Sequence, residues 1–286
     1  MIPAIWTLGK FSWDVALPQF ILSGVHTCEI LGLENVYIDG HVAVILIPGR
    51  HSLKLYKEIN ACAARFDRVI FFLYGDEEGS FDSTRLEHPN KILWWAMPPF
   101  KKQTVDQAVP NGWPTQAPGL IAQAGNLPRI FEWSFYGQST HVRRRECCAA
   151  LREMRNGKLL ETAGFTQGVP HDEYYRVMVQ SLMVACPSGP CTVDSFRICE
   201  ALEAGCIPIA DDCTPDPNFP SGYWNYVFEE TKLPFPVLGN WAKLPQVIDE
   251  WLYNWESNAE DCAMWWRAKK SSWIDKMKSD VRMCRP

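Results

Sequence analysis

Runs of apolar residues alternate with helical patterns along most of this chain. Residues 42–47 form a continuous apolar run that ends in Pro48-Gly49, and residues 69–74 form a second one that ends in a Gly-flanked acidic loop. Uninterrupted apolar runs of this length are typical of strands buried on both faces of a parallel sheet. A helical pattern over residues 52–66 separates the two runs. This alternation predicts an α/β fold with a parallel sheet.

The second half of the chain repeats the alternation after a stretch of different composition. Residues 109–128 are rich in Pro, Gly, Asn and Gln and show no clear periodicity, so we interpret them as a crossover between two domains. Further strands are predicted at residues 2–8, 90–97, 129–136 and 158–164, and further helices at 140–154, 171–181, 241–255 and 262–280. The chain therefore reads as two α/β halves joined by a linker.

Residues 181–212 carry the strongest indication of function. An apolar run at residues 182–186 stops at a Pro-Ser-Gly-Pro loop, a helix opens at Asp194 or Ser195, and a second apolar run at residues 206–210 ends in two aspartates. This order predicts a strand, a tight loop, a helix and a second strand. Open parallel sheets bind ligands at the carboxyl ends of their strands, where a helix N-terminus favours an anion such as a diphosphate.

Arg197 and Glu200 lie three residues apart on this predicted helix and therefore share one face. An arginine fork suits phosphate oxygens, and a carboxylate suits the hydroxyls of a ribose. On spacing alone, a solvated surface ion pair is the commoner use of two such residues.

The surrounding motif resembles a known donor site. The run Ser195-x-Arg197-x-x-Glu200-Ala201-Leu202-x-Ala204-Gly205-Cys206-Ile207-Pro208-Ile209 is similar to the signature of exostosin-like glycosyltransferases, in which the Arg and the Glu hold a nucleotide-sugar. The resemblance implies the α/β architecture called GT-B, in which two Rossmann-like domains with parallel sheets face a central cleft. It implies an acceptor domain at residues 1–125, a donor domain at residues 126–260, and a basic helix at residues 261–286 that crosses back to the first domain.

A second loop is expected to complete the donor site. Gly137 leads from a predicted strand into a helix with three arginines, and a similar loop faces the nucleotide in related enzymes. Consecutive helical residues point in different directions, so one or two of these arginines can reach the site, and we expect Arg143 or Arg144. The alternative is a solvated basic turn. Ser188, Gly189 and Ser195 lie on the other loop and are expected to contact the donor.

Transfer with inversion needs a base that deprotonates the acceptor hydroxyl. Asp76 and Glu77 follow a buried strand and are candidates for this base, and Glu78 beside them is a candidate for binding the acceptor. Such acidic loops are commonly just solvated. The rival bases are Asp14, His41 and His51, and Trp13 is a further candidate acceptor contact.

The resemblance also bears on stereochemistry and cofactors. Retaining GT-B enzymes often carry a second glutamate whose position here is Thr192, so inversion is favoured. The sequence contains no Asp-x-Asp, and we therefore expect a nucleotide-sugar donor, UDP-linked, with no metal requirement and no tightly bound cofactor. Residues 171–175 are candidates for the nucleobase pocket, and Asp211, Asp212 and Asp216 for contacts to the sugar or for ordering the loop.

Charge and composition bear on the acceptor and the compartment. The net charge is −5, yet residues 263–286 hold seven Lys or Arg against two Asp, with three tryptophans among them. This basic tail favours DNA as the acceptor, with the sugar added to a hydroxymethylated pyrimidine of phage DNA. An amphipathic helix with a solvated basic face is the alternative explanation for the charge of the tail. A bacterial glycan or a lipid-linked sugar is the alternative acceptor.

The cysteines and the hydropathy suggest a cytoplasmic protein. The 11 cysteines are odd in number and lie within apolar patterns, which indicates reduced thiols, and no apolar window is long enough to span a membrane. We expect the compact type of this family found in bacteria and phages, located in the cytosol of the bacterium or infected host. Two other function classes remain: a non-catalytic nucleotide- or glycan-binding module, and a dehydrogenase, which the absence of a G-x-G-x-x-G motif disfavours.

Overall fold

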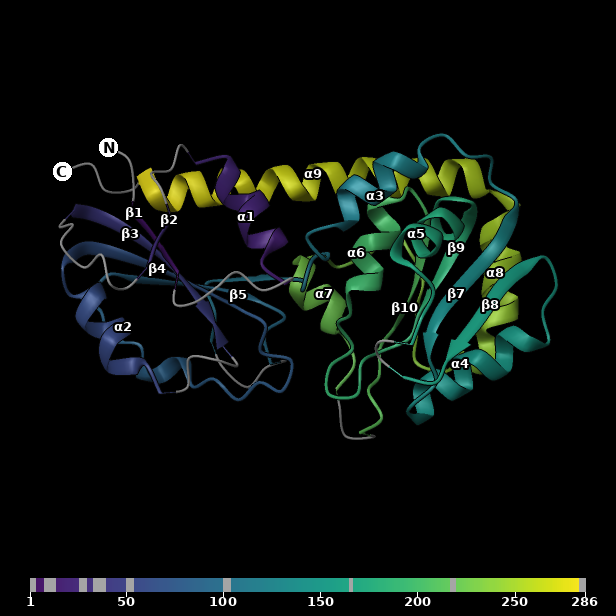
Figure 1. Ribbon diagram of the computed structural model, residues 1–286, viewed down its shortest axis with the longest axis horizontal. Coiled ribbons are helices and arrows are strands. Elements are labelled where there is room, and N and C mark those ends of the chain that lie inside the picture. The colour runs from purple at the N-terminus through teal and green to yellow at the C-terminus, as the bar shows by residue number, and fades with distance from the viewer. Residues whose placement is uncertain are drawn as a thin grey trace. The chain divides into compact units, whose positions relative to one another are not determined.

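The chain folds into two compact units. The computed structural model describes residues 4–7, 14–25, 30–32, 40–49, 54–99, 104–164, 167–216 and 220–282. One unit comprises Met1–Pro114 with Ala268–Pro286, and the other comprises Thr115–Arg267. The division thus falls after residues 114 and 267, whereas the predicted boundaries follow residues 125 and 260. Each unit contains one parallel sheet, which confirms the predicted α/β class (Figure 1).

The sheet of the first unit has the strand order β2-β1-β3-β4-β5-β6, with all neighbours parallel. Its strands are β1 (Ala4–Thr7), β2 (Ile30–Gly32), β3 (Gly40–Pro48), β4 (Phe66–Tyr74), β5 (Lys91–Ala96) and β6 (Gln107–Val109). The two uninterrupted apolar runs are the central strands β3 and β4, whose apolar side chains are buried. Strand β2 is added on one side of β1, and β3 to β6 follow on the other side, so the switch point lies between β1 and β3. In a doubly wound sheet the loops at this switch point line the ligand site.

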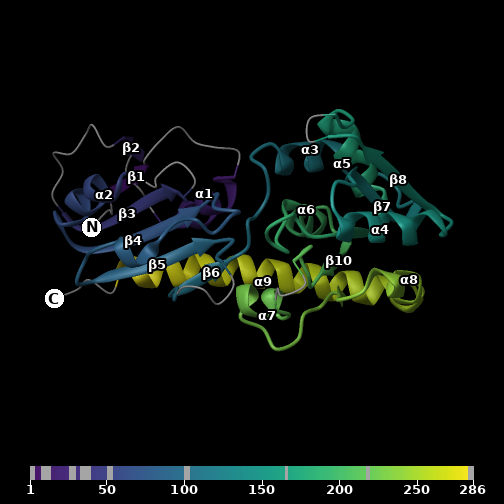
Figure 2. The ribbon, with the colours of Figure 1, turned by 90° about the horizontal axis from the view of Figure 1, so that it is seen from below.

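Helices cover both faces of this sheet. Helix α1 (Ala16–Ser23) follows β1, and α2 (Tyr56–Ala63) packs Ile59 and Cys62 into a core with β3, β4 and β5. The second half of α9 (Trp255–Arg282) runs along this sheet (Figure 2). There Trp94 Nε1 donates a hydrogen bond of 2.9 Å to Asp280 Oδ2. Lys276 Nζ also pairs with the Asp280 carboxylate, which is buried. These polar contacts fix the end of α9 on β5.

The sheet of the second unit has the strand order β11-β10-β9-β7-β8, again parallel throughout. Its strands are β7 (Phe131–Gln138), β8 (Gly157–Thr162), β9 (Ser181–Cys186), β10 (Ile207–Asp211) and β11 (Val237–Leu238). Numbered within the unit, this is the order 2-1-3-4-5 of a doubly wound sheet. Its switch point lies between β7 and β9.

Helices on both faces complete the second unit. They are α3 (Ala117–Ala124), α4 (Val142–Arg152), α5 (His171–Val179), α6 (Phe196–Glu203), α7 (Tyr223–Phe228) and α8 (Leu244–Tyr253). Helices α4 and α8 contact each other on one face, and α3 contacts α5 and α6 on the other. The interdomain crossover predicted over residues 109–128 contains the division after residue 114, and it also contains α3, a helix that was not predicted. Pro118 is tolerated because it lies in the first turn of α3. Packing on α5 stabilises this helix, although its sequence shows no helical pattern.

The first half of α9 contributes aromatic side chains to the core of the second unit. The Trp265 ring lies 5.0 Å from Phe228 and 5.7 Å from Phe235, measured between ring centroids. Trp266 is buried, and its Nε1 donates a hydrogen bond of 2.7 Å to Glu203. These tryptophans, which interleave with basic residues in the sequence, therefore face the protein interior. Burial of their rings explains their number better than stacking on a ligand does.

Candidate functional site

The predicted donor-site residues lie on two strand–loop–helix segments at the switch point of the second sheet. Strand β7 ends at Gln138 and leads into α4, and the neighbouring β9 ends at Cys186 and leads into α6. These segments carry Gly137, Arg143, Arg144, Ser188, Gly189, Ser195, Arg197 and Glu200. The carboxyl ends of β7 and β9 meet at one edge of the sheet, and α4 and α6 begin there.

Arg197 lies in the first turn of α6 and reaches across to β7. Its Nη2 donates a hydrogen bond of 2.9 Å to the carbonyl of Tyr136, and its guanidinium carbon lies 4.8 Å from the centroid of the Phe135 ring. A Cβ atom on Gly137 would lie only 2.8 Å from Nη2, so the glycine makes room for the guanidinium. Arg197 Nε is buried without a hydrogen-bond partner among the described residues. The side chain is thus held in place and keeps donor capacity.

Glu200 lies one turn further along α6 and is bound by two tyrosines. Tyr174 and Tyr175 donate hydrogen bonds of 2.7 and 2.5 Å to its two carboxylate oxygens. Burial raises the pKa of Glu200 above its ordinary value, while these hydrogen bonds and the charge of Arg197 oppose the shift. A carboxylate offers about four acceptor positions, so two remain for hydroxyls of a ligand. Tyr174 and Arg197 also line a small cavity together with Ser134, Tyr136, Val177, Met178 and Val184.

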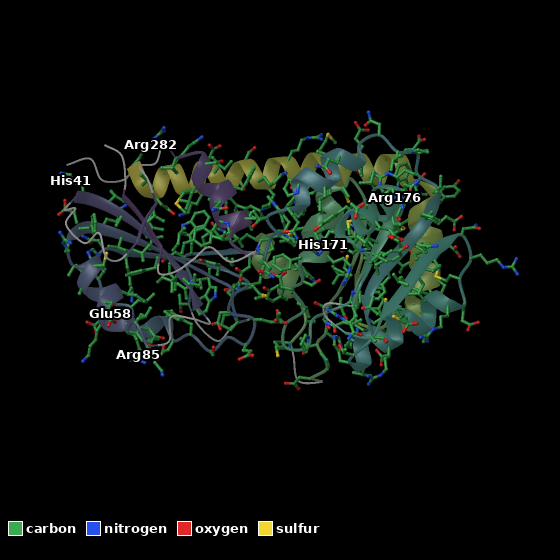
Figure 3. All side chains as sticks on the ribbon, viewed as in Figure 1. His41, Glu58, Arg85, His171, Arg176 and Arg282 are labelled. Carbon is green, nitrogen blue, oxygen red and sulfur yellow. The ribbon has the colours of Figure 1, made fainter. Side chains whose placement is uncertain are left out.

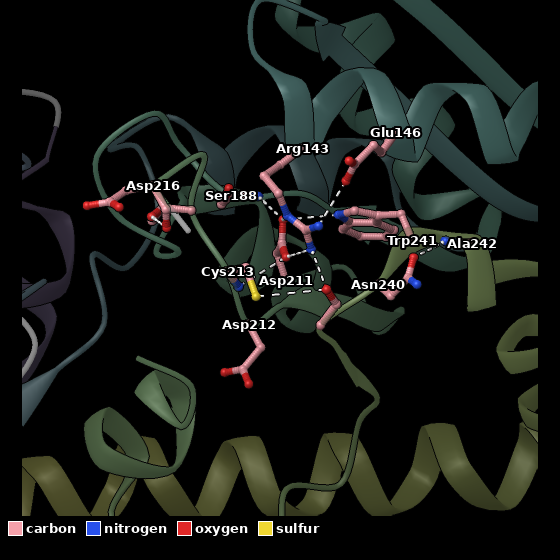
Figure 4. Close-up of polar contacts among 12 residues, drawn as sticks. Arg143, Glu146, Ser188, Asp211, Asp212, Cys213, Asp216, Asn240, Trp241 and Ala242 are labelled. Carbon is pink, nitrogen blue, oxygen red and sulfur yellow. Dashed lines mark hydrogen bonds and ion pairs between the residues drawn. The ribbon is translucent and has the colours of Figure 1, made fainter. Parts of the chain in front are cut away.

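Asp211, at the end of β10, is fully buried and joins the two loops (Figure 4). Its carboxylate accepts hydrogen bonds from Arg143 Nη2 at 2.5 Å and Nε at 3.3 Å, and from Trp241 Nε1 at 3.0 Å. It also accepts from the backbone N–H groups of Ser188 and Cys213, each at 3.2 Å. Of the two roles considered for Asp211, ordering the loop is therefore the one that its contacts fit. Arg143 is engaged by this carboxylate, by Glu146 and by the Gly239 carbonyl.

The other two arginines of α4 differ in exposure. Arg144 is buried, and its Nε donates a hydrogen bond of 3.1 Å to the Ser188 carbonyl, which ties α4 to the loop after β9. Arg145 is exposed, and its Nη1 donates to the Thr140 carbonyl at 3.1 Å. Gly189 is buried within the same loop. Arg143 and Arg144 therefore both hold the loops at this edge.

Several buried polar atoms at this edge have no hydrogen-bond partner among the described residues. They are Ser188 Oγ, Ser195 Oγ, Arg197 Nε and both ring nitrogens of His141. Buried polar groups in folded proteins are nearly always satisfied, so such a concentration indicates a site for a polar ligand. His141 was not predicted from the sequence. Its position at the N-cap of α4, shortly after a strand that ends in Gly137-Gln138, is the signal that could have identified it.

Asp14 lies in the loop after β1, at the switch point of the first sheet. Its Oδ1 is buried and has no hydrogen-bond partner in the described part of the chain. Its Oδ2 lies 2.2 Å from the position that a Cβ atom on Gly75 would take, and Gly75 has a φ of +66°. The carboxylate is therefore packed over the backbone of the loop after β4, and only glycine permits this approach.

Asp76 orders the acidic loop in which it lies. It is 2% exposed; its Oδ1 accepts hydrogen bonds of 3.0 Å from the Ser80 backbone and hydroxyl, and its Oδ2 accepts one of 2.9 Å from the Phe81 backbone. Glu77 and Glu78 are exposed. The three acidic residues therefore do not share one environment, and Asp76 has both oxygens engaged by its own loop.

The other residues singled out in the sequence lie elsewhere. His41 pairs with Asp67 at the start of β3, the opposite end of the strand from the switch-point loops (Figure 3). Trp13 and His51 lie outside the described residues. Thr192 Oγ1 accepts a hydrogen bond of 3.1 Å from the Asp194 backbone. Within the described ranges, no group of three His, Cys, Asp or Glu side chains could hold a metal ion.

The basic residues of α9 are partly engaged by the protein. Lys270 Nζ lies 5.4 and 5.6 Å from the ring centroids of Phe20 and Trp113, and Lys276 pairs with Asp280. Arg267 and Arg282 are exposed. The described part of the chain contains no helix with the length and apolar character needed to cross a bilayer.

Comparison with known proteins bears on the second unit above all. Residues 141–283 match the family described as RXYLT1 C-terminal domain, which is half of the chain. No match was found among curated proteins. A DNA-modifying β-glucosyltransferase, solved in the presence and absence of uridine diphosphoglucose, is similar in structure with a TM-score of 0.49 and 13% identity over 98% of this chain and 99% of that chain. Neither the donor nor the acceptor of the present chain follows from that similarity.

Proposed function

The chain belongs to the RXYLT1 C-terminal domain family, which is related to exostosin-like glycosyltransferases, and we propose that it transfers a sugar from a UDP-linked donor to an acceptor hydroxyl. The observation that carries this proposal is the set of unpartnered buried polar atoms at the switch point of the second sheet. They lie where two helices begin and where doubly wound sheets hold nucleotides.

The contacts of the site support a role for each residue. Arg197 and the helix N-termini supply positive charge for the diphosphate, and Glu200 has acceptor capacity for ribose hydroxyls. Gly137 makes room for the Arg197 guanidinium, and Gly189 lies in the loop between β9 and α6. Arg143 and Arg144 hold the loops through Asp211 and Ser188. We propose that this positive charge takes the place of a metal, because the sequence lacks the Asp-x-Asp that would hold one.

Asp14 is the base that we propose for the acceptor hydroxyl. Its unpartnered Oδ1 can accept a proton, whereas the carboxylate of Asp76 already accepts three hydrogen bonds from its own loop. The deprotonated acceptor oxygen attacks the anomeric carbon, the bond to the diphosphate breaks, and UDP leaves with the electron pair. One displacement of this kind inverts the anomeric centre. Glu77 and Glu78 are exposed and stay candidates for contacts to the acceptor.

For the acceptor we propose DNA carrying a hydroxymethylated pyrimidine, in the cytosol of a bacterium or phage-infected host. The support is the charge of the tail and the exposure of Arg267 and Arg282, because Trp266 and Trp273 are buried and offer no stacking surface. A glycan or lipid-linked sugar is the alternative. Mass spectrometry after incubation with nucleotide sugars distinguishes them, because a hexose or pentose gain appears either on modified DNA or on glycans.

Calorimetric titration with UDP tests the donor site. Arg197→Ala removes a charged hydrogen-bond donor, and we expect affinity to fall by about ten- to a hundredfold. Arg152→Ala is the matched control, because that arginine is exposed in the last turn of α4, and its loss should change affinity by less than about twofold. Unchanged UDP binding in a folded Arg197→Ala variant would refute the donor site. UDP binding without transfer or donor hydrolysis in the unmutated protein would instead favour a binding module.

A further inference from the structure

His141 lies at the edge of the donor site without a structural task of its own. It is the residue that caps α4, yet its side chain makes no capping hydrogen bond. Both ring nitrogens are buried, and the ring lies against the Ser188 backbone, but neither nitrogen makes a hydrogen bond of ordinary geometry to a residue that the structure describes. A neutral imidazole carries one donor and one acceptor, so leaving both unsatisfied costs free energy that a ligand would recover.

Ser188 adds a second unsatisfied group beside the ring. The residue is fully buried, its Oγ has no partner among the described residues, and its backbone lies against His141. Its other polar groups are engaged: the N–H donates to Asp211 and the carbonyl accepts from Arg144. The loop is therefore held from both sides, and the hydroxyl is the one polar group of Ser188 left for a ligand.

The charges around the pair favour an anion. The groups that face His141 are Arg144 and Arg145 on its own helix, the Ser188 backbone on the neighbouring loop, and Asp211 on β10. Burial and the nearby arginines lower the pKa of His141 to about 4, so the ring is neutral at pH 7 and can donate one N–H. The Asp211 carboxylate is already compensated by Arg143. The N-terminus of α4 adds positive potential.

We propose that His141 and Ser188 form the subsite for a phosphate group of the donor, with the imidazole N–H and the serine O–H donating to its oxygens. This inference rests on the proposed function and adds two specific contacts to it. A sugar or base would leave the positive potential uncompensated, whereas a diphosphate matches both the donors and the charge.

Paired titrations with UDP, uridine and pyrophosphate test the subsite. Ser188→Ala removes only the unpartnered hydroxyl and keeps the backbone contacts, and His141→Leu removes the imidazole at similar size. We expect each change to weaken UDP and pyrophosphate binding by about tenfold and to leave uridine binding unchanged. His141→Asn keeps an N–H donor and should recover part of the loss.

Matched controls separate this role from a structural one. Ser181 is a fully buried serine at the start of β9, and its Oγ donates to the Val177 carbonyl at 2.7 Å. Ser181→Ala should lower stability without changing the ratio of UDP to uridine affinity. His41→Leu replaces an exposed imidazole at the amino end of β3, and it should change neither the stability nor the ratio of UDP to uridine affinity.

The outcomes distinguish the subsite from the proposed function. If the unmutated protein binds UDP and both site variants bind it equally well, the subsite is wrong and the donor site stands. An equal loss of UDP and uridine binding also overturns the subsite, since it points to a distorted pocket. If the unmutated protein binds no UDP, the proposed function fails. In that case pyrophosphate binding tests the subsite separately. Pyrophosphate binding that is weakened by His141→Leu supports the subsite, and any other result refutes it.

Discussion

Asp211→Asn perturbs the most heavily hydrogen-bonded carboxylate at the candidate site. The side chain is fully buried and accepts from Arg143, Trp241, Ser188 and Cys213. Replacing the carboxylate by an amide removes the charge that compensates a guanidinium whose side chain is 11% exposed. Breaking a buried ion pair from one side costs about 3–5 kcal/mol, which is a large part of the stability of a typical domain.

The size of the effect can be checked with a double-mutant cycle. Arg143→Met removes the other charge, and the double variant should be little less stable than either single variant, with a coupling of about 3 kcal/mol. Glu146→Gln is the control: Glu146 Oε2 lies 2.9 Å from Arg143 Nη1 but is 47% exposed, so its loss should cost less than about 1 kcal/mol.

Urea unfolding of the full chain, with hydrogen–deuterium exchange over residues 181–216, measures these changes in the unit that contains them. Faster exchange at Ser188 and Cys213 is expected in Asp211→Asn, because their N–H groups lose their acceptor. A destabilisation below about 1 kcal/mol, or strictly additive single effects, would show that the pair is solvated and that Asp211 does not organise the loops.

Three further predictions concern the site and its surroundings. Gly137→Ala places a methyl group 2.8 Å from Arg197 Nη2, so UDP affinity should fall by about tenfold while the urea midpoint changes little, because a flexible side chain can shift. Burial raises the pKa of Tyr175 and Tyr223 above the ordinary value. Above about pH 10 these tyrosines therefore lose their protons in the unfolded chain and keep them in the folded chain. Each of the two then lowers the free energy of unfolding by about 1.4 kcal/mol for every further pH unit. Tyr223→Phe should make this decline shallower in urea titrations at pH 9–11, and an unchanged slope would contradict the assignment. Asp14→Asn should abolish sugar transfer and leave UDP binding intact; transfer at the unmutated rate would exclude Asp14 as the base.

Much of the fold could be predicted because it rests on local patterns. The apolar runs at residues 42–47 and 69–74 are parallel strands, since a strand covered on both faces must be apolar throughout. Helix α3 could not be predicted, because its Pro- and Gly-containing segment is helical through contacts with α5 and α6. The tryptophans of α9 were ambiguous for a similar reason: sequence shows that they alternate with charges, and only packing shows which side they face.

The sequence by itself determined the α/β class, the two parallel sheets, and the relation to exostosin-like glycosyltransferases, which residues 195–209 predicted and the family match confirmed. It also placed Arg197 and Glu200 on one helix face, since that relation depends only on helical spacing. The tertiary structure decided which polar groups are already satisfied. Asp211 meets Arg143 across 68 positions of sequence, Asp76 is bound by its own loop, and His141 and Asp14 keep buried atoms without partners in the described chain. Whether a buried polar group has a hydrogen-bond partner depends on which distant segments the sheet order brings together, and this cannot be predicted from spacing along the chain.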